Sequence, residues 1–140
     1  MKRLIVDIDN TLSRTREGDY ATAEVIKPVR QRLVEYQQMG FTIVLHSARN
    51  MRTHEGNIGL ITAQTGPVLI KWLDENSIPY DEIILGKPWC GHEGFYVDDR
   101  AIRPDEFATL SRPEIDALLA AAKDRLQALE AQAVRKEPQL

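Results

Sequence analysis

The sequence predicts an α/β protein in which helices cover both faces of a parallel sheet. Two observations predict this class. Short, almost continuous apolar runs alternate with segments of helical period. Polar residues then follow each apolar run directly, as at the ends of buried parallel strands. With 140 residues we expect a single domain over residues 1–140, with a core over about 1–110 and a C-terminal helix over about 112–134.

The first elements are a strand, a polar connection and a helix. Leu4–Ile8 is apolar and β-branched at several positions, which predicts a buried strand. Residues 13–27 are polar and predict a loop or a small hairpin over the end of that strand. Pro28 begins a helical pattern and Gly40 ends it.

The middle of the chain repeats this alternation. Phe41–Leu45 predicts a second buried strand, and a long polar loop follows it to about Gly66. Pro67–Asn76 predicts a helix, and Glu82–Leu85 predicts a short third strand. Phe95–Val97 predicts a fourth.

The C-terminal part predicts a long helix. Ser111 to Glu114 forms a capping-box signature at its start. An apolar stripe along the helix predicts a core or dimer contact, so a homodimer is possible. The stripe consists of Ile115, Leu118, Leu119, Ala122, Leu126 and Leu129.

Composition indicates a cytoplasmic protein. The net charge of −3 shows no basic bias, so a long nucleic acid is an unlikely but possible partner. Cys90 is the single cysteine, which excludes an internal disulfide and suits a reducing compartment. The apolar run at the start is too short for a signal peptide or a membrane span, so we expect no membrane association.

Four polar segments follow the four predicted strands. The carboxyl ends of parallel strands meet at one edge of a sheet, which is where ligands bind in this class. We therefore expect these segments to converge on one site. They are Asp7 with Asp9, Ser47, Lys87, and Asp98 with Asp99.

The pair Asp7 and Asp9 indicates chemistry on a phosphate. Two carboxylates on one face of a strand repel each other unless a cation or a shared proton offsets the repulsion. Near neutral pH, Mg²⁺ is the simplest solution because it prefers oxygen ligands. We expect Asp7, Asp98 and a backbone carbonyl near Asp9 to hold this Mg²⁺. Asp99 would bind it directly or through a water.

The same residues could hydrolyse a phosphate ester. Asp7 would be the nucleophile that forms an aspartyl-phosphate, and Asp9 the acid and then the base. Ser47 and Lys87 would hold phosphoryl oxygens. Thr11 could steady the loop, or bind Asp7 or the phosphoryl group.

This constellation resembles the haloacid-dehalogenase-type (HAD) phosphatases. The resemblance implies a three-layer Rossmann-like core, Mg²⁺ and a phosphatase activity. The stretch between Asp9 and Pro28 is too short for a cap domain, so the chain resembles the capless branch. Asn10 stands where many relatives have glycine, and asparagine tolerates the unusual backbone angle expected there. The four family motifs are matched, in order, by Asp7-x-Asp9-x-Thr11, Ser47, Lys87 and Asp98-Asp99.

Two longer segments, 41–52 and 84–104, resemble small phosphatases associated with capsular polysaccharide biosynthesis. That resemblance implies a phosphorylated sugar or polysaccharide precursor as substrate. Ser47-x-Arg49 also looks like the phosphatase half of polynucleotide kinase-phosphatases, which implies a nucleotide or polynucleotide 3′-phosphate instead. A receiver-like module that carries a phospho-aspartate signal is the non-enzyme alternative, and phosphoryl transfer to a sugar hydroxyl is a further one.

Several nearby residues keep two interpretations. Arg49 and Arg52 could bind the leaving group of the substrate or lie in solvent. Trp89 is interpreted as covering the core, with stacking on a sugar or base as the alternative. His46 is interpreted as a packing residue.

Overall fold

The computed structural model describes residues 1–15 and 19–136 of the chain. These residues form two compact units, Met1–Gly94 (unit 1) and Phe95–Leu140 (unit 2). Each unit is described by itself, and the single domain expected over residues 1–140 stays a prediction.

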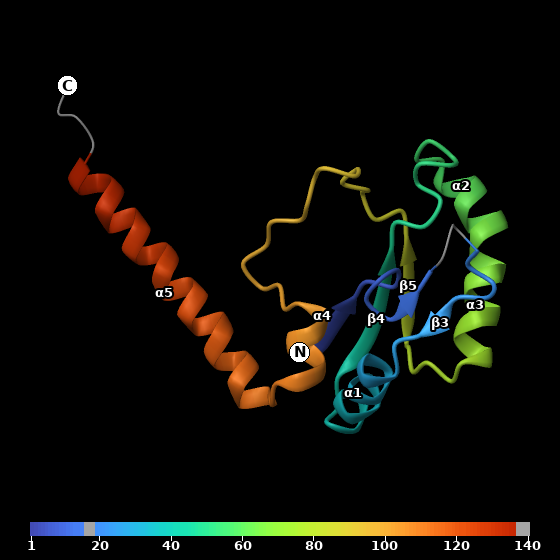
Figure 1. Cartoon of the computed structure of the whole chain (residues 1–140), viewed down its shortest axis with the longest axis horizontal. Coiled ribbons are helices and arrows are strands. Elements are labelled where there is room, and N and C mark those ends of the chain that lie inside the picture. Colours follow the sequence, from blue (N-terminus) through green and yellow to red (C-terminus); the bar gives the residue numbers. More distant parts are fainter. Residues whose placement is uncertain (16–18, 137–140) are drawn as a thin grey trace. The chain divides into compact units, whose positions relative to one another are not determined.

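Unit 1 is built on a three-stranded parallel sheet. Its strands are β1 (Arg3–Val6), β4 (Thr42–Ser47) and β5 (Glu82–Leu85), which lie in the order β1-β4-β5 (Figure 1). The strands predicted in this part of the chain are therefore confirmed, as is their parallel direction.

A small hairpin follows the first strand. Its strands are β2 (Ser13–Arg14) and β3 (Glu24–Val25), which pair antiparallel. The amide of Ile26 donates to the carbonyl of Leu12, which carries the chain from the hairpin into the next helix. The structure thus contains the hairpin form of the predicted connection.

Two helices pack on one face of the sheet. They are α1 (Lys27–Gln38) and α3 (Gly66–Glu75), and Arg30 near the start of α1 donates a hydrogen bond to the carbonyl of Asn76 at the end of α3. Successive strand residues point to opposite faces. On one face Ile43 and Leu45 are fully buried, whereas the other face carries Ile5 at 55% exposure. A helical layer on the second face stays a prediction.

The segment before α3 differs from the expectation. The polar loop predicted to about Gly66 is wrong for its second half, because α2 (Ile58–Leu60) and a π-helical turn, η1 (Ile61–Thr65), precede α3. Asn57 caps the first of these by accepting a hydrogen bond from the amide of Leu60. The wider turn lies directly before Pro67, which cannot donate a backbone hydrogen bond to the preceding turn.

Unit 2 contains α4 (Pro104–Thr109) and α5 (Arg112–Lys136). The prediction of a C-terminal helix is confirmed. So is its capping box, since Ser111 and Glu114 each accept a hydrogen bond from the other's amide. Among the described helices, none is both long and apolar enough to cross a membrane.

The fourth strand predicted at Phe95–Val97 is wrong. This segment is irregular, and its three side chains are 80%, 51% and 89% exposed. Its aromatic and β-branched residues favour an extended chain, but a strand exists only where a neighbouring backbone completes its ladder. No described strand pairs with these residues.

Candidate active site

A tight turn after β1 presents the first two acidic residues. The carbonyl of Ile8 accepts hydrogen bonds from the amides of Thr11, Leu12 and Ser13, which folds the chain back on itself. Ile8 and Leu12 are fully buried and anchor this turn. Asn10 lies at φ 61°, so the unusual backbone angle predicted for this position is confirmed.

Asp7 is held by a hydroxyl and a cation. Thr11 Oγ1 donates to Asp7 Oδ2 at 2.9 Å, and Lys87 Nζ donates to Asp7 Oδ1 at 3.2 Å. The Asp7 side chain remains 34% exposed, whereas that of Lys87 is 17% exposed. The carboxylate is therefore oriented by its neighbours and still open to a ligand.

Lys87 reaches Asp7 because the chain after β5 is tied to the end of β4. The amide of Lys87 donates to the carbonyl of Ser47 at 3.0 Å. Gly86 precedes it at φ 86°, where a Cβ would collide with the side chain of Ile58. Only glycine fits this turn without strain.

Asp9 has a different set of partners. Arg49 Nε donates to both carboxylate oxygens at 3.1 Å, and Thr15 Oγ1 donates to Oδ1 at 2.9 Å. Ser13 Oγ adds a longer contact at 3.4 Å. Each aspartate thus has its own cationic partner: Asp7 contacts Lys87, and Asp9 contacts Arg49.

Ser47 and Arg49 are both buried at the end of β4. Ser47 Oγ accepts a hydrogen bond from the amide of Arg49 at 3.0 Å, which shapes this turn and leaves the hydroxyl free to donate. The Arg49 side chain is fully buried, and the ring of Tyr20 covers it with 4.3 Å between the guanidinium carbon and the ring centre. Of the two interpretations of Arg49, solvent exposure is therefore wrong.

Two titratable groups beside this cluster have shifted pKa values. Burial raises the pKa of Tyr20, and the charge of Asp9 raises it further, while Arg49 opposes the shift. Burial lowers the pKa of His46, the charge of Lys87 lowers it further, and Asp7 opposes the shift. His46 is half-buried within β4, which agrees with the interpretation as a packing residue.

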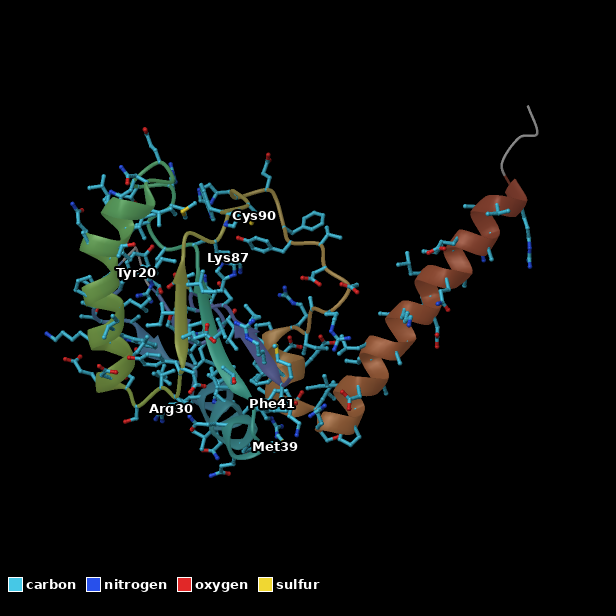
Figure 2. All side chains as sticks on the ribbon, turned by 180° about the vertical axis from the view of Figure 1, so that it is seen from behind. Tyr20, Arg30, Met39, Phe41, Lys87 and Cys90 are labelled. Carbon is cyan, nitrogen blue, oxygen red and sulfur yellow. The ribbon has the colours of Figure 1, made fainter. Side chains whose placement is uncertain are left out.

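Arg52 and Trp89 lie at a polar pocket of about 210 Å³. Trp89 is 41% exposed and lines this pocket, which is compatible both with covering the core and with stacking on a sugar or base. Trp89 follows Lys87 by two residues, so the same loop after β5 carries both side chains. Figure 2 shows Lys87 and Tyr20 toward the carboxyl ends of the strands, whereas Phe41 and Met39 lie toward the amino ends.

The predicted metal ligands fall in both units. Asp7 and Asp9 lie in unit 1, whereas Asp98 and Asp99 are exposed residues of unit 2, where Asp98 Oδ1 accepts a hydrogen bond from the amide of Arg100. Within the described ranges, no group of three or more His, Cys, Asp or Glu side chains is close enough to hold a metal ion. In unit 1 the partly exposed Asp7 carboxylate has the oxygen donors that Mg²⁺ prefers.

A second hollow in unit 1 lies apart from these residues. It has a volume of about 470 Å³, and its mostly apolar walls come from α2, η1, α3 and β5. None of the acidic residues discussed above lines it.

Sequence reasoning missed Tyr20 and Thr15 as parts of the site. Both lie between β2 and β3. Thr15 contacts Asp9, which is near in the sequence, whereas Tyr20 contacts Arg49, which is distant in the sequence. A Thr two residues after Ser13 on the same strand face was a readable signal for Thr15. Nothing in the local sequence around Tyr20 indicates stacking on Arg49.

Comparison with known proteins finds a solved structure that is similar over most of this chain. A scan against protein-family models finds no match, and a search of curated proteins finds none. The crystal structure of a protein from Vibrio cholerae matches with 52% sequence identity and a TM-score of 0.85, over 86% of this chain and 98% of that one.

Two structures of the Pnkp1/Rnl/Hen1 complex, the second described as an RNA repair complex, match weakly. Their TM-scores are 0.44 and 0.45, with identities of 23% and 18%. They cover 60% and 66% of this chain and 27% and 28% of those chains. By its identity and coverage with the Vibrio cholerae protein, the chain belongs to the same family as that protein.

Proposed function

We propose that the protein is a Mg²⁺-dependent phosphomonoesterase of the HAD type, with Asp7 as its nucleophile. The observation that carries the proposal is the arrangement around Asp7. The carboxylate is oriented by Thr11 and Lys87, is partly exposed, and is followed two residues later by a second carboxylate with its own partners.

The residues support a two-step reaction. In the first step an oxygen of Asp7 attacks phosphorus, the bond from phosphorus to the leaving oxygen breaks, and Asp9 gives its proton to that oxygen. In the second step water attacks phosphorus of the aspartyl-phosphate, Asp9 takes the water proton, and the bond from phosphorus to the Asp7 oxygen breaks, which restores Asp7 and frees inorganic phosphate. Arg49 Nε donates to both oxygens of Asp9, which orients this carboxylate for proton transfer.

Positive charge around the phosphoryl group would come from Lys87, and Ser47 could donate its hydroxyl to a phosphoryl oxygen. Asp7 and the backbone near Asp9 would hold Mg²⁺, and Asp98 and Asp99 are the further carboxylates that the sequence offers. When bound, Mg²⁺ offsets the repulsion between an anionic nucleophile and an anionic substrate.

The substrate we propose is a phosphorylated sugar or a polysaccharide precursor, in line with the sequence resemblance to the capsular polysaccharide phosphatases. A nucleotide or polynucleotide 3′-phosphate is the competing class. The aromatic side chains beside the site suit a ring of either kind.

The test is the release of an aryl alcohol from an aryl phosphate, measured with Mg²⁺, with EDTA, and after Mg²⁺ is restored. We expect EDTA to abolish turnover and added Mg²⁺ to restore it. Full turnover in EDTA, or no hydrolysis under any condition, would overturn the proposal. A phosphorylated protein that survives for hours would favour the receiver-like alternative.

A further inference from the structure

The polar pocket beside the cluster is formed by the same connections that carry the predicted catalytic groups. Tyr20 lies between β2 and β3, in the segment from β1 to α1 that also contains Asp9, and Trp89 comes from the connection after β5, which carries Lys87. The other lining residues follow Ser47 at the end of β4. Among the described residues, the lining consists of Tyr20, Ala48, Asn50, Arg52, Thr53 and Trp89.

A chain of contacts links this pocket to Asp9. Arg49 donates to the Asp9 carboxylate on one side, and the Tyr20 ring lies over the guanidinium on the other. The same Tyr20 is part of the pocket wall. The pocket is therefore connected, through Tyr20 and Arg49, to the residue that we propose as proton donor to the leaving oxygen.

Two aromatic rings, those of Tyr20 and Trp89, line the pocket. The Trp89 ring has two neighbours that orient it. The Trp89 ring contacts His92 edge-on, with 5.0 Å between the ring centres, and the guanidinium of Arg52 lies 5.7 Å from the Trp89 ring centre. Arg52 Nη1 and His92 Nε2 are 3.2 Å apart, which closes this group of three. An exposed tryptophan fixed in this way is suited to stacking against a ring.

The cation in the pocket wall is Arg52, and the cation behind it, Arg49, is paired with Asp9. Among the described residues that line it there is one cation, Arg52, and no carboxylate. Behind Tyr20, the buried Nη1 and Nη2 atoms of Arg49 have no hydrogen-bond partner among the described residues. Asp9 satisfies only the Nε side of that guanidinium. Arginine favours carboxylate and phosphate groups because its planar donors match their oxygens.

The volume limits the part of a bound molecule that the pocket itself can hold. About 210 Å³ is below the range of about 300–1,000 Å³ that is typical of sites for drug-sized ligands. The pocket is thus of a size for one ring and its substituents.

From these observations we infer that this pocket is the subsite for the leaving group, and that it selects a ring that carries a second anionic group. The inference rests on the proposed phosphatase function. The anionic group is a carboxylate on a sugar or a second phosphate on a nucleoside, and Arg52 is its specificity-determining residue.

The test compares kcat/KM within two matched pairs of esters, in the presence of Mg²⁺. The sugar pair is glucuronic acid 1-phosphate and glucose 1-phosphate, and the nucleotide pair is adenosine 3′,5′-bisphosphate and adenosine 3′-phosphate. An aryl phosphate is measured beside them. Arg52→Gln removes the cation at an exposed position, and Trp89→Ala removes the ring wall.

Arg3→Gln is the matched control, because Arg3 forms an exposed ion pair with Glu82 at the amino ends of the strands. Thermal unfolding confirms that each variant is folded.

We expect the wild type to prefer the anionic member of one pair by about ten-fold or more. Arg52→Gln should bring this preference below about three-fold, while Arg3→Gln keeps it. Trp89→Ala should lower kcat/KM for both members of that pair by about ten-fold. The pair that shows the preference identifies the source of the second charge.

The two hypotheses fail in different ways. No hydrolysis of the aryl phosphate by the wild type removes the proposed function. Hydrolysis of the aryl phosphate without a preference in either pair, or with a preference that survives in Arg52→Gln, overturns the subsite and leaves the phosphatase intact.

Discussion

Lys87 Nζ lies 3.2 Å from Asp7 Oδ1, although 80 positions separate the two residues in the sequence. The contact exists because β5 and β1 both end at the same edge of the sheet, with β4 between them. The fold itself therefore supplies a positive charge at the carboxylate that we propose as the nucleophile.

The first prediction concerns this pair. Lys87→Met keeps the length of the side chain and removes its charge, and we expect kcat for an aryl phosphate to fall by about 10²–10³-fold because phosphoryl charge loses a fixed partner. Lys71→Met is the control, since the Lys71 side chain is 77% exposed on α3. Equal rates for both variants would show that Lys87 has no part in the reaction.

A second prediction concerns the turn that carries Lys87. Gly86 and Gly40 both have positive φ angles, but a Cβ at Gly40 meets open space and one at Gly86 meets Ile58. We expect Gly40→Ala to cost about 1 kcal/mol of unfolding free energy and Gly86→Ala to cost more. Urea unfolding measures both. Equal costs would mean that Ile58 moves aside freely.

A third prediction concerns pH. The pKa of His46 is lowered in the folded protein, mainly by burial and then by the charge of Lys87. The unfolded chain then binds more protons between the folded pKa and the ordinary value of 6.5, so stability falls as the pH drops below that value.

Between about pH 7 and about pH 5, we expect the unfolding free energy of the His46→Gln variant to fall by less than that of the wild type. Urea unfolding at both values provides the measurement, with His54→Gln as the control for loss of an imidazole elsewhere. A wild type and a His46→Gln variant with the same pH dependence would contradict the assignment.

A fourth prediction concerns Asp98. If Asp98 is a metal ligand, Asp98→Asn should weaken the stabilisation of the protein by Mg²⁺, so that about ten-fold more Mg²⁺ is needed for the same rise in melting temperature. Asp124→Asn, at an exposed position of α5, is the control. An unchanged Mg²⁺ response in Asp98→Asn would place Asp98 outside the metal site.

The strands and main helices of unit 1 were predictable because each is marked by its own apolar pattern and by glycine or proline at its ends. The bounds predicted for the third strand, Glu82–Leu85, match β5, where an apolar run is closed by glycine. The helical turns over 58–65 were missed, although Asn57 offered a capping signal. Phe95–Val97 was misassigned because strand propensity does not by itself provide a partner strand.

The candidate site was likewise predictable only in part. That Asp7 and Lys87 would meet followed from the rule that ligands bind at the carboxyl ends of parallel strands. That Arg49 would be buried under Tyr20 did not, since a side-chain contact between two connections depends on the packing of the whole unit. The roles of Asp98 and Asp99 rest on the sequence motif alone.

The measurement that tests the central claim most directly is a search for the phosphorylated residue. Asp9→Asn should slow hydrolysis of the intermediate, so acid quenching during turnover of an aryl phosphate and peptide mass spectrometry should find one phosphoryl group on Asp7. Asp7→Asn should carry none and should lose activity by several orders of magnitude. Wild-type turnover in Asp7→Asn, or a phosphoryl group on a different residue, would contradict the account.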